Sequence, residues 1–339
     1  MLLAGDVGGT KTLLGLFERA HGRPQRLAVH AYLTRDFTSF GELLDAFARD
    51  VNTPFAARTP LRTRRRRGPR IAAAVVGVAG PVVGGTARLT NVQWSVSAAD
   101  IAARFHTPRV RILNDLEAMA LGAGVLGPEE VIQLQRGVAR EDGNAVIIAA
   151  GTGLGEAYLH RVHGRLRSMA SEGGHADFAA RTDREIELVR MLRRLYGRAE
   201  VEHVLSGPGL LNLHRFTHDG QDCPEIRGLD RIDAPAAVSR AALHGSCPAC
   251  VEALSLFVEA YGAEAGNLAL RGVATSGVFV GGGIAPQILP ALQDGRFMKA
   301  FCAKGAMSAL TATMPVNVIL IPEVGLLGAA VAAQDQVEK

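Results

Sequence analysis

Short apolar runs rich in β-branched residues alternate along the chain with longer stretches of helical periodicity. Residues 2–11 begin as an apolar run and reach Gly8-Gly9-Thr10, and residues 13–17 are apolar again, so a hairpin of two strands is predicted. The same order of run, Gly-Thr turn and run recurs at 145–159 around Gly151-Thr152-Gly153. This recurrence indicates an internal duplication of one strand-turn-strand unit.

Two further apolar runs, Ile71–Ala79 and Val110–Leu113, are typical of buried parallel strands. The second run ends at Asn114-Asp115, a pair that can cap a following helix. Open α/β sheets bind ligands at the carboxyl ends of their strands, so this polar pair stands where a ligand is expected. Another strand, Val278–Val280, leads into the glycine run Gly281–Gly283.

Alternating strands and helices predict an α/β fold. The chain has 339 residues, which exceeds one typical domain and favours two. We expect a small α/β domain over residues 1–113, a large α/β domain over 114–323, and a C-terminal helix over 324–339 that joins the first domain. Helical patterns are expected at 40–50, 182–196, 246–270 and 325–334.

Composition and charge narrow the class of protein. Hydrophobic residues make up 48% and charged residues 21%, with 39 glycines, which excludes a disordered, collagen-like or coiled-coil chain. The net charge of +4 comes from six arginines between Arg62 and Arg70, interpreted as a solvated insertion rather than a basic surface, so nucleic-acid binding is disfavoured. The longest uncharged stretch, 272–293, contains a glycine triplet and two prolines, so no membrane span is predicted.

The cysteines favour a reducing compartment, the cytoplasm. Four cysteines in so long a chain do not form a disulfide framework. Cys247-Pro-Ala-Cys250 is a single CxxC, and a zinc site would want a second ligand pair at comparable spacing. The pair is therefore interpreted as a surface loop with two thiols.

The glycine-rich turns have the composition of phosphate sites. Gly8-Gly9-Thr10 offers backbone N–H groups and a hydroxyl, and Asp6 is placed to hold Mg²⁺ through water. No helix follows at once, which distinguishes the segment from Walker A and Rossmann loops. One such turn could be a hairpin that binds no ligand. The second turn, Gly151-Thr152-Gly153, makes two glycine turns in the chain, and the pair favours a two-sided phosphate clamp. Gly281–Gly283 is either a surface for adenine or ribose or a simple strand-to-helix turn.

Three polar segments could carry chemistry. The Asp115 carboxylate could accept the proton of an attacking hydroxyl as a general base, with an N-cap role for Asn114-Asp115 as the alternative. Glu172 and His175 flank two glycines, and this spacing suits hydrogen bonds to a polyol better than a metal ion. Glu202 could be a further acceptor or a helix-surface charge.

Six motifs in this order resemble those of the bacterial glucokinases, which belong to the superfamily of hexokinase, actin and heat-shock ATPases. The resemblance covers nearly the whole chain. It implies a two-domain actin-like ATPase (ribonuclease H-like) fold with an active-site cleft between the domains. It also implies ATP-dependent phosphorylation of glucose at its 6-hydroxyl, usually by a cytoplasmic homodimer. The motifs are Gly5-Asp-Val-Gly-Gly-Thr10, Asn114-Asp-Leu-Glu-Ala118, Gly151-Thr-Gly-Leu-Gly155, Ser171-Glu-Gly-Gly-His-Ala-Asp-Phe178, Glu202-His-Val-Leu-Ser-Gly207 and Gly277-Val-Phe-Val-Gly-Gly-Gly-Ile284.

Carried over residue by residue, the resemblance implies Asp115 as the catalytic base. It implies that glucose hydroxyls are bound by Asn114, Asp115, Glu172, His175 and Glu202. The first phosphate loop for Mg-ATP would be Gly5, Asp6, Val7, Gly8, Gly9 and Thr10, and the second Gly151, Thr152 and Gly153. The adenosine would be bordered by Gly281, Gly282 and Gly283.

Two other functions would use the same fold. A sugar-sensing regulator without kinase activity would carry a helix-turn-helix ahead of the first strand, and the first strand here begins at Leu2. A chaperone-like ATPase would need a substrate-binding segment beyond the ATPase core, and the chain ends at Lys339. We therefore expect a glucose kinase, with the regulator as the alternative.

Overall fold

The computed structural model describes residues 1–58, 70–89, 92, 94–162, 164–221 and 223–338. Arg62 to Arg67 of the arginine run therefore lie outside the described residues. The chain divides into two compact units, one formed by Met1–Leu126 with Glu323–Lys339 and the other by Gly127–Pro322. This division follows residue 126, whereas the sequence analysis expected a boundary after residue 113.

The first unit is built on a five-stranded sheet in the order β3-β2-β1-β4-β8. The first two strands form the expected antiparallel hairpin around the first glycine turn, and β1, β4 and β8 run parallel. The carboxyl ends of these three strands therefore meet at one edge of the sheet. The strands are β1 (Leu2–Val7), β2 (Lys11–Glu18), β3 (Gln25–Leu33), β4 (Ala73–Val78) and β8 (Val110–Asn114).

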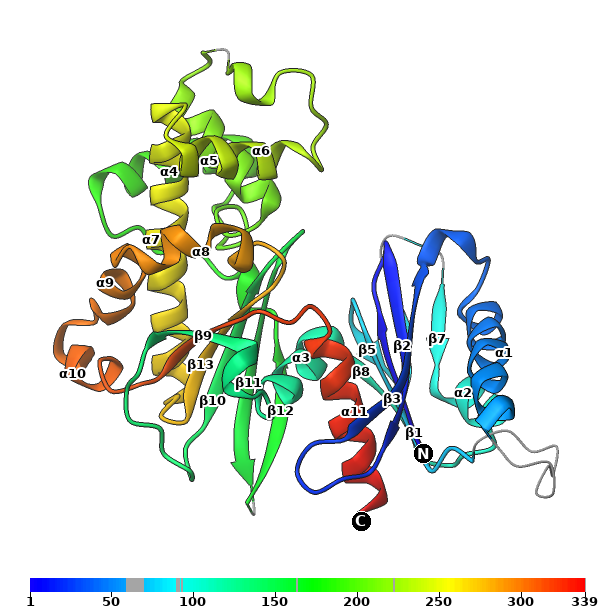
Figure 1. The fold of residues 1–339 in the computed structure, drawn as a ribbon. Coiled ribbons are helices and arrows are strands. Elements are labelled where there is room, and N and C mark those ends of the chain that lie inside the picture. Colours follow the sequence, from blue (N-terminus) through cyan, green and yellow to red (C-terminus); the bar gives the residue numbers. More distant parts are fainter. Residues whose placement is uncertain (59–69, 90–91, 93, 163, 222, 339) are drawn as a thin grey trace. The chain divides into compact units, whose positions relative to one another are not determined.

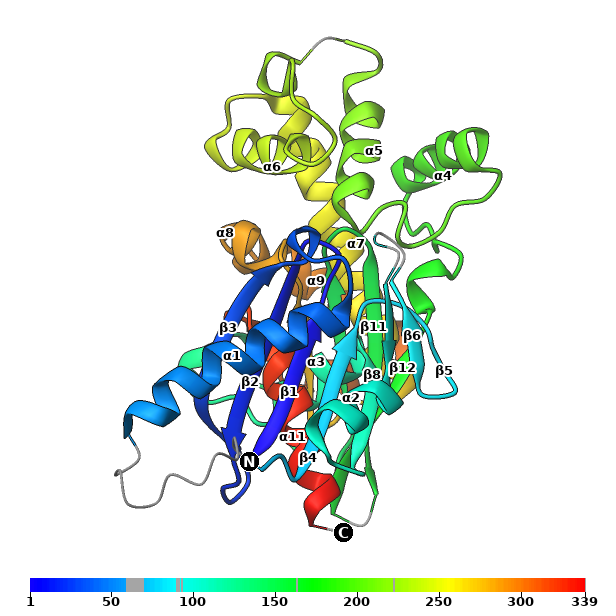
Figure 2. The ribbon, with the colours of Figure 1, turned by 90° about the vertical axis from the view of Figure 1, so that its right-hand side faces the viewer.

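Helices cover both faces of this sheet (Figure 2). On one face α1 (Phe40–Arg58) and α2 (Ala98–Phe105) pack through buried residues such as Phe47 and Ile101. On the other face lie α3 (Asp115–Ala123) and α11 (Val324–Val337). A small antiparallel sheet completes the unit, with strands β5 (Val82–Val83), β6 (Thr86–Arg88) and β7 (Ser95–Ser97), and a 3-10 turn η1 (Thr34–Asp36) follows β3.

Close packing of α3 against α11 explains why the unit extends beyond residue 113. The C-terminal helix α11, red in Figure 1, lies beside α3. A Cβ at Gly328 would lie 1.6 Å from the carbonyl oxygen of Ala118, and a Cβ at Gly122 would lie 2.1 Å from that of Val324. Only glycine permits this backbone approach, so α3 is held in the first unit by a helix from the far end of the chain.

The second unit repeats this plan. Its sheet has the order β12-β11-β10-β13-β14-β9, in which β10 and β11 form an antiparallel hairpin and β13 and β14 run parallel to β10. Five of its strands thus match the order and directions of the first sheet, and the predicted duplication is confirmed. The strands are β9 (Val131–Gln135), β10 (Ala145–Ala150), β11 (Leu154–Val162), β12 (Arg165–Ser171), β13 (Gly277–Gly281) and β14 (Val316–Ile319).

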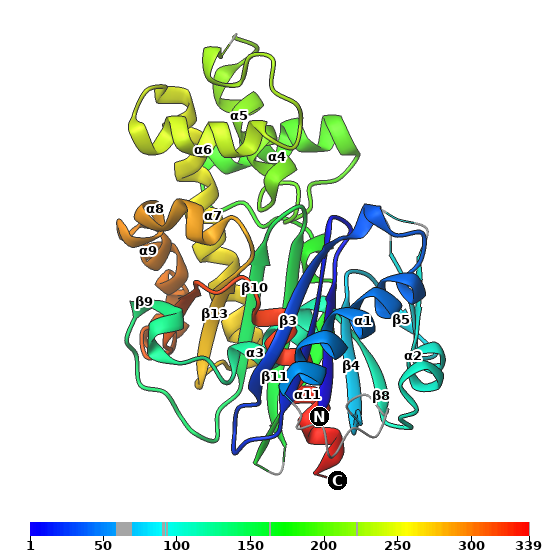
Figure 3. The ribbon, with the colours of Figure 1, turned by 45° about the vertical axis from the view of Figure 1, so that its right-hand side comes forward.

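The long helix α7 (Pro248–Gly272) is the centre of the helical part of this unit (Figure 1 and Figure 3). Around its N-terminal half lie α4 (Asp183–Tyr196), α5 (Gly207–His218) and α6 (Ala234–His244). Further along it lie α8 (Leu289–Gln293), α9 (Arg296–Cys302) and α10 (Ser308–Thr311). The 3-10 turns are η3 (Pro128–Glu130), η4 (Gly173–His175), η5 (Pro224–Ile226), η6 (Ala285–Ile288) and η7 (Gly305–Met307).

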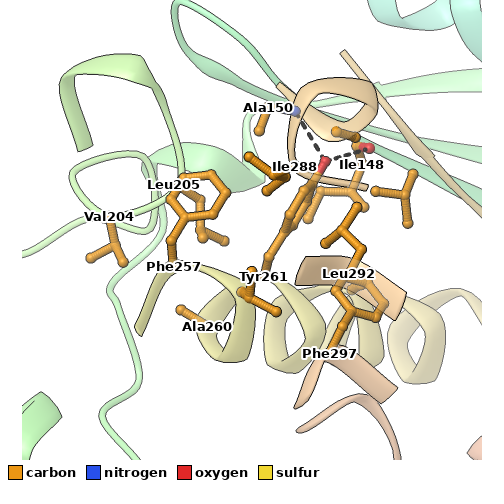
Figure 4. Packing of buried hydrophobic residues seen from close by; sticks show 14 of the residues in the cluster. Ile148, Ala150, Val204, Leu205, Phe257, Ala260, Tyr261, Ile288, Leu292 and Phe297 are labelled. Carbon is orange, nitrogen blue, oxygen red and sulfur yellow. Dashed lines mark hydrogen bonds between the residues drawn. The ribbon is translucent and has the colours of Figure 1, made fainter. Parts of the chain in front are cut away.

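Tyr261 connects α7 to the sheet (Figure 4). Its ring is fully buried, and its hydroxyl accepts a hydrogen bond from the backbone N–H of Ala150 at 3.2 Å. The same hydroxyl lies 3.2 Å from the carbonyl oxygen of Gly281 and 3.4 Å from that of Ile148. The hydroxyl of a buried tyrosine needs hydrogen-bond partners, and here backbone groups at the last residues of β10 and β13 provide them.

The CxxC segment is not the surface loop that the sequence analysis expected. Cys247 is the N-cap of α7, and Cys250 lies in the first turn of that helix, where it is fully buried in the core of the unit. The first turn of α7 faces α5 and α6, so the second thiol is enclosed. All four cysteines are free thiols.

Among the described residues, no single helix is long and apolar enough to cross a membrane. Only α6 and α7 taken together, across a bend of 103°, reach such a length and composition.

Candidate active site

In the first unit, three predicted site residues lie at the same edge of the sheet. Val7 pairs with Val78, and Val78 pairs with Asn114, so the ends of β1, β4 and β8 are in register. Asp6 is therefore close to the place where β8 passes into α3. Parallel pairing of the three strands thus brings Asp6 near Asn114-Asp115, a proximity that the sequence analysis did not predict.

Asn114 caps α3. Its side-chain oxygen accepts a hydrogen bond from the N–H of Leu116 at 2.9 Å, and the Glu117 carboxylate accepts from the N–H of Asn114 at 3.4 Å, which completes a capping box. The Asn114 amide nitrogen donates to the carbonyl oxygen of Gly80 at 3.3 Å. The N-cap role that the sequence analysis weighed against chemistry is thus present for Asn114.

Asp115 is the first residue of α3 and is half-buried. One of its carboxylate oxygens accepts a hydrogen bond from the N–H of Leu116 at 2.9 Å. The positive end of the helix dipole favours a carboxylate at this position. The start of α3 therefore stabilises the negative charge of the Asp115 carboxylate at the edge of the sheet.

Asp6 lies in a tight enclosure made by glycines. It pairs with Gly77 across β1 and β4, and a Cβ at Gly77 would lie only 2.9 Å from the Cβ of Ala118. A Cβ at Gly325, in the first turn of α11, would lie 2.8 Å from a carboxylate oxygen of Asp6. Burial, assisted by the charge of Asp115, raises the pKa of Asp6 to about 6.

The first glycine turn is supported by Thr34, which the sequence analysis missed. The N–H of Gly8 donates to the carbonyl oxygen of Lys11 at 3.1 Å and closes the turn. The buried Thr34 hydroxyl donates to the carbonyl oxygen of Gly8 at 2.8 Å, and its N–H donates to that of Thr10 at 3.0 Å. A single threonine after a strand carries no sequence signal for this role.

In the second unit, the two other glycine segments lie side by side. Ala149 pairs with Gly281, so Gly151–Gly153 and Gly281–Gly283 follow neighbouring strands. Gly282 has a φ of +83°, and a Cβ there would lie 2.2 Å from the carbonyl oxygen of Ala150. Gly151 is also tied to α5, because its carbonyl oxygen accepts from the N–H of Gly207 at 2.8 Å.

Glu202 binds the second glycine turn. One carboxylate oxygen accepts a hydrogen bond from the N–H of Leu154 at 2.8 Å, and a Cβ at Gly153 would lie 2.6 Å from it. The N–H of Glu202 donates to the carbonyl oxygen of Gly174 at 2.8 Å. Glu202 thus connects the turn with the segment around Glu172 and His175 and is not a helix-surface charge.

His175 has a charged partner that the sequence analysis did not identify. Its Nδ1 lies 2.9 Å from a carboxylate oxygen of Glu200, and Arg198 lies 3.6 Å from the other oxygen of that carboxylate. The bond to Glu200, with the charges of Glu202, Glu200 and Glu172, raises the pKa of His175. Backbone pairing of Asp177 with Glu200 brings the two segments together. No local spacing could have revealed Glu200, which is 25 positions away.

A buried carboxyl group lies beneath this segment. Glu156 on β11 is fully buried, and neither of its carboxyl oxygens has a hydrogen-bond partner among the described residues. A Cβ at Gly173 would lie 2.1 Å from one of these oxygens. Burial, with the charge of Glu264, raises the pKa of Glu156 to about 7.

An open hollow of about 600 Å³ in the second unit is a different feature. It is lined by residues at the amino ends of β10 and β13, among them Arg140, Asp142 and Ser276. These lie at the opposite end of the strands from the glycine turns, so the hollow contains none of the predicted site residues.

Comparisons with known proteins identify the family and the fold. A family model described as Glucokinase matches residues 3–336. Glucokinases from a Synechocystis and a Nostoc species are 38% and 36% identical, over 98% of this chain and 97% and 98% of theirs. The crystal structure of a glucokinase from an Antarctic psychrotroph has a TM-score of 0.85 and 29% identity, and covers 98% of both chains. With its duplicated sheets and the polar residues at their edges, the chain belongs to the glucokinase family, the ATP-dependent kinases that phosphorylate glucose.

Proposed function

We propose that this protein transfers the γ-phosphoryl group of ATP to the 6-hydroxyl of glucose, with Asp115 as the general base. The observation that carries the proposal is the position of Asp115. It is a half-buried carboxylate at the first position of α3, directly after β8, and its charge acts on Asp6 at the end of β1. Phosphoryl transfer depends mainly on positioning the reactants and stabilising their charge. A single carboxylate that orients and deprotonates the attacking hydroxyl can therefore serve as the general base.

Glucose hydroxyls would be bound by Asn114, Glu172, His175 and Glu202, together with Asp115. The remaining hydrogen-bonding capacity of Glu202 supports this role. One of its carboxylate oxygens accepts from the N–H of Leu154, and the carboxylate can still accept hydrogen bonds from sugar hydroxyls. Because Glu200 is an acceptor for Nδ1 of His175, the Nε2 atom of that ring is left to meet a sugar hydroxyl.

The polyphosphate of ATP would be held by backbone N–H groups of the two glycine turns. Nothing lies within 4 Å of a Cβ built at Gly151 or Gly283, so both positions face open space. A phosphate or ribose can approach the backbone most closely where no side chain intervenes. Gly5 to Thr10 would form the first of these loops and Gly281 to Gly283 would border the adenosine.

The residues around Asp6 fit a magnesium ion bound through water. The donor is the carboxylate of Asp6, which lies near enough to Asp115 for the charge of Asp115 to raise its pKa. Carboxylates and water are the ligands that Mg²⁺ prefers. When bound, the ion would neutralise charge on the phosphates, while Asp6 would hold its water ligand in place.

We also infer a cytoplasmic homodimer. Four free thiols, three of them near one another in the second unit, suit a reducing compartment. The dimer rests on the family alone. Sedimentation at micromolar concentration would overturn it if only a 35.8 kDa monomer were found.

The test of the function is a coupled assay for glucose 6-phosphate with Mg-ATP. Asp115→Asn should lower kcat by about 10² to 10⁴ while glucose binding persists. Asp183→Asn is the matched control, because Asp183 is also the first residue of a helix, α4, but is exposed. Near-normal turnover in Asp115→Asn would contradict the assignment of the base.

The same assay addresses specificity. Mannose, fructose and N-acetylglucosamine serve as competitors, and ADP and polyphosphate as alternative donors. A site with several fixed acceptors should discriminate strongly against sugars that lack a contacted hydroxyl, by as much as about 10⁴. Binding of glucose and ATP without turnover in the unmodified protein would instead favour the sugar-sensing regulator.

A further inference from the structure

Four metal-ligating side chains gather at one point in the second unit, away from the candidate active site. His214 and His218 come from the last turns of α5, Cys223 precedes η5, and Cys250 comes from the first turn of α7. All four side chains are buried, and their ligand atoms lie within 4.8 Å of one another. The sequence analysis disfavoured a zinc site at the CxxC pair because no second ligand pair has comparable spacing, whereas here the other ligands come from separate elements.

The distances match those of a tetrahedral metal site. Zinc binds sulfur at about 2.3 Å and nitrogen at about 2.0 Å, so neighbouring ligand atoms of a tetrahedron are about 3.3 to 3.8 Å apart. The sulfur atoms of Cys223 and Cys250 are 3.9 Å apart, and the Cys250 sulfur lies 4.0 Å from Nε2 of His218. These two distances exceed the tetrahedral values by a few tenths of an ångström, and all four ligand atoms lie within 4.8 Å of one another, so a contraction of at most about 1 Å would complete the geometry.

Both imidazoles present one nitrogen to the cluster. Nδ1 of His218 lies 2.8 Å from the carbonyl oxygen of His214, which leaves Nε2 pointing to the sulfur atoms. Such a bond from the second ring nitrogen to a backbone carbonyl is the usual way in which a ligating histidine is oriented. Nε2 of His214 is buried and has no hydrogen-bond partner among the described residues. A buried nitrogen without a partner is costly, and a metal ion would satisfy it.

We propose that His214, His218, Cys223 and Cys250 bind a structural Zn²⁺ ion. Two thiolates and two imidazoles form the ligand set that zinc prefers among divalent ions. With four protein ligands no coordination position remains for water, so the site is structural rather than catalytic. The proposal is independent of the assignment of the kinase residues.

The ion would join three segments of the helical part. It would link the C-terminal end of α5 to the start of α7 and would fix the connection at Cys223 between them. The N-terminal end of α5 contacts the second glycine turn through the bond from Gly207 to Gly151. The metal would therefore stabilise the helix that supports this turn.

Cys247 lies close by but is placed outside the ligand set. Its sulfur is 3.3 Å from Nε2 of His218 and accepts a hydrogen bond from the N–H of Cys250 at 3.5 Å. It is thus the N-cap of α7, and it is more exposed than Cys250. Substitution of Cys247 therefore distinguishes the proposed ligand set from a set that includes Cys247.

The experiment is a metal analysis of the full chain, purified without a histidine tag and without chelators. We expect about one zinc per chain by plasma mass spectrometry. Cys223→Ser, Cys250→Ser and His214→Ala should lower this content to below about 0.1 per chain. Cys302→Ser, a cysteine of α9 in the same unit, and Cys247→Ser should keep it.

Cobalt substitution and unfolding give readouts that do not depend on activity. The cobalt form of the unmodified protein should show the intense visible absorption of tetrahedral coordination and a thiolate-to-metal band, both kept in Cys247→Ser and lost in Cys250→Ser. Removal of zinc should lower the melting temperature, and readdition should restore it. If the ligand variants do not fold, the zinc content, the cobalt spectrum and the zinc-dependent melting temperature of the unmodified protein test whether the site binds metal.

Three results would overturn the proposal. The first is a protein that contains no zinc as purified and retains none after zinc is added and excess is removed. The second is a disulfide between Cys223 and Cys250 in protein prepared under reducing conditions. The third is loss of zinc from Cys247→Ser with retention in His214→Ala, which would refute the proposed ligand set.

Discussion

Nδ1 of His175 lies 2.9 Å from a carboxylate oxygen of Glu200. Because a carboxylate only accepts hydrogen bonds, Nδ1 carries a proton, and Nε2 is the ring nitrogen left to face a ligand. Glu200 therefore sets the tautomer of the histidine that we propose to bind glucose, although it is not itself one of the predicted sugar ligands.

Glu200→Gln should lower the pKa of His175, because the loss of the negative charge removes the main interaction that raises it. The KM for glucose should increase about tenfold, as expected for a weakened hydrogen bond to a charged group, with a smaller effect on kcat. NMR titration of labelled His175 and steady-state kinetics measure the two effects. Glu187→Gln, an exposed residue of α4, is the control. An unchanged His175 titration would refute the positioning role.

Asn114 has two roles that substitutions can separate. Asn114→Ala removes the N-cap of α3 and should lower the free energy of unfolding by about 0.5 to 2 kcal/mol, whereas Asn114→Asp keeps a capping oxygen and should stay near the unmodified value. Both variants lack the amide donor and should bind glucose more weakly. Denaturant unfolding and glucose titration measure the two properties.

Ser97→Ala is the matched control for Asn114, because Ser97 caps α2 in the same unit through the N–H of Asp100. It should lose comparable stability and keep its affinity for glucose. Equal glucose affinity in Asn114→Ala and Ser97→Ala would show that Asn114 only caps the helix.

The glycines at the ends of β10 and β13 should respond differently to alanine. A Cβ at Gly283 or Gly151 meets nothing within 4 Å, so these variants should fold normally but raise the KM for ATP if the nucleotide approaches their backbone. Gly282→Ala places a Cβ 2.2 Å from a backbone oxygen at a φ of +83° and should destabilise the fold itself. Thermal unfolding and ATP kinetics distinguish the cases, and an unchanged KM in Gly283→Ala would exclude close approach there.

Glu156 should make stability depend on pH. Its pKa is raised from 4.5 to about 7, so between these values the unfolded chain has lost a proton that the folded chain retains. The contribution to stability is therefore greatest below pH 4.5, decreases as pH rises through this interval, and is constant above it. Glu156→Gln should increase the free energy of unfolding at pH 8 by about 2 to 3 kcal/mol relative to the unmodified protein.

Denaturant unfolding at pH 4.5, 6 and 8 measures this effect. Glu141→Gln, in an exposed loop of the same unit, should leave the pH profile unchanged. If the free energy of unfolding of Glu156→Gln depended on pH in the same way as that of the unmodified protein, this carboxyl group would not be protonated in the folded protein at neutral pH.

Much of the fold was predictable because its signals are local. The hairpin around Gly8-Gly9-Thr10, its repeat around Gly151-Thr152-Gly153 and the strand that ends at Asn114 follow from apolar periodicity and turn residues. The α/β fold and the family are confirmed by the structure and the comparisons. The roles of the site residues stay predictions, to be tested as above.

The boundary between the units was not predictable in the same way. It lies after residue 126 because α3 packs against α11, a helix from the far end of the chain. The glycines that allow this approach, Gly122 and Gly328, look like ordinary helix-weakening residues until their partners are known. A periodic pattern predicts that a helix exists but not against which element it packs.

The sequence by itself determined the strands, the glycine turns and the position of the carboxylate at the end of β8, because residues adjacent in the chain decide each of them. Only the tertiary structure decided the partners: Glu200 for His175, Thr34 for the first turn, and His214, His218 and Cys223 around Cys250. These contacts join residues of different elements, and their energies depend on packing in three dimensions, which periodicity along the chain does not record.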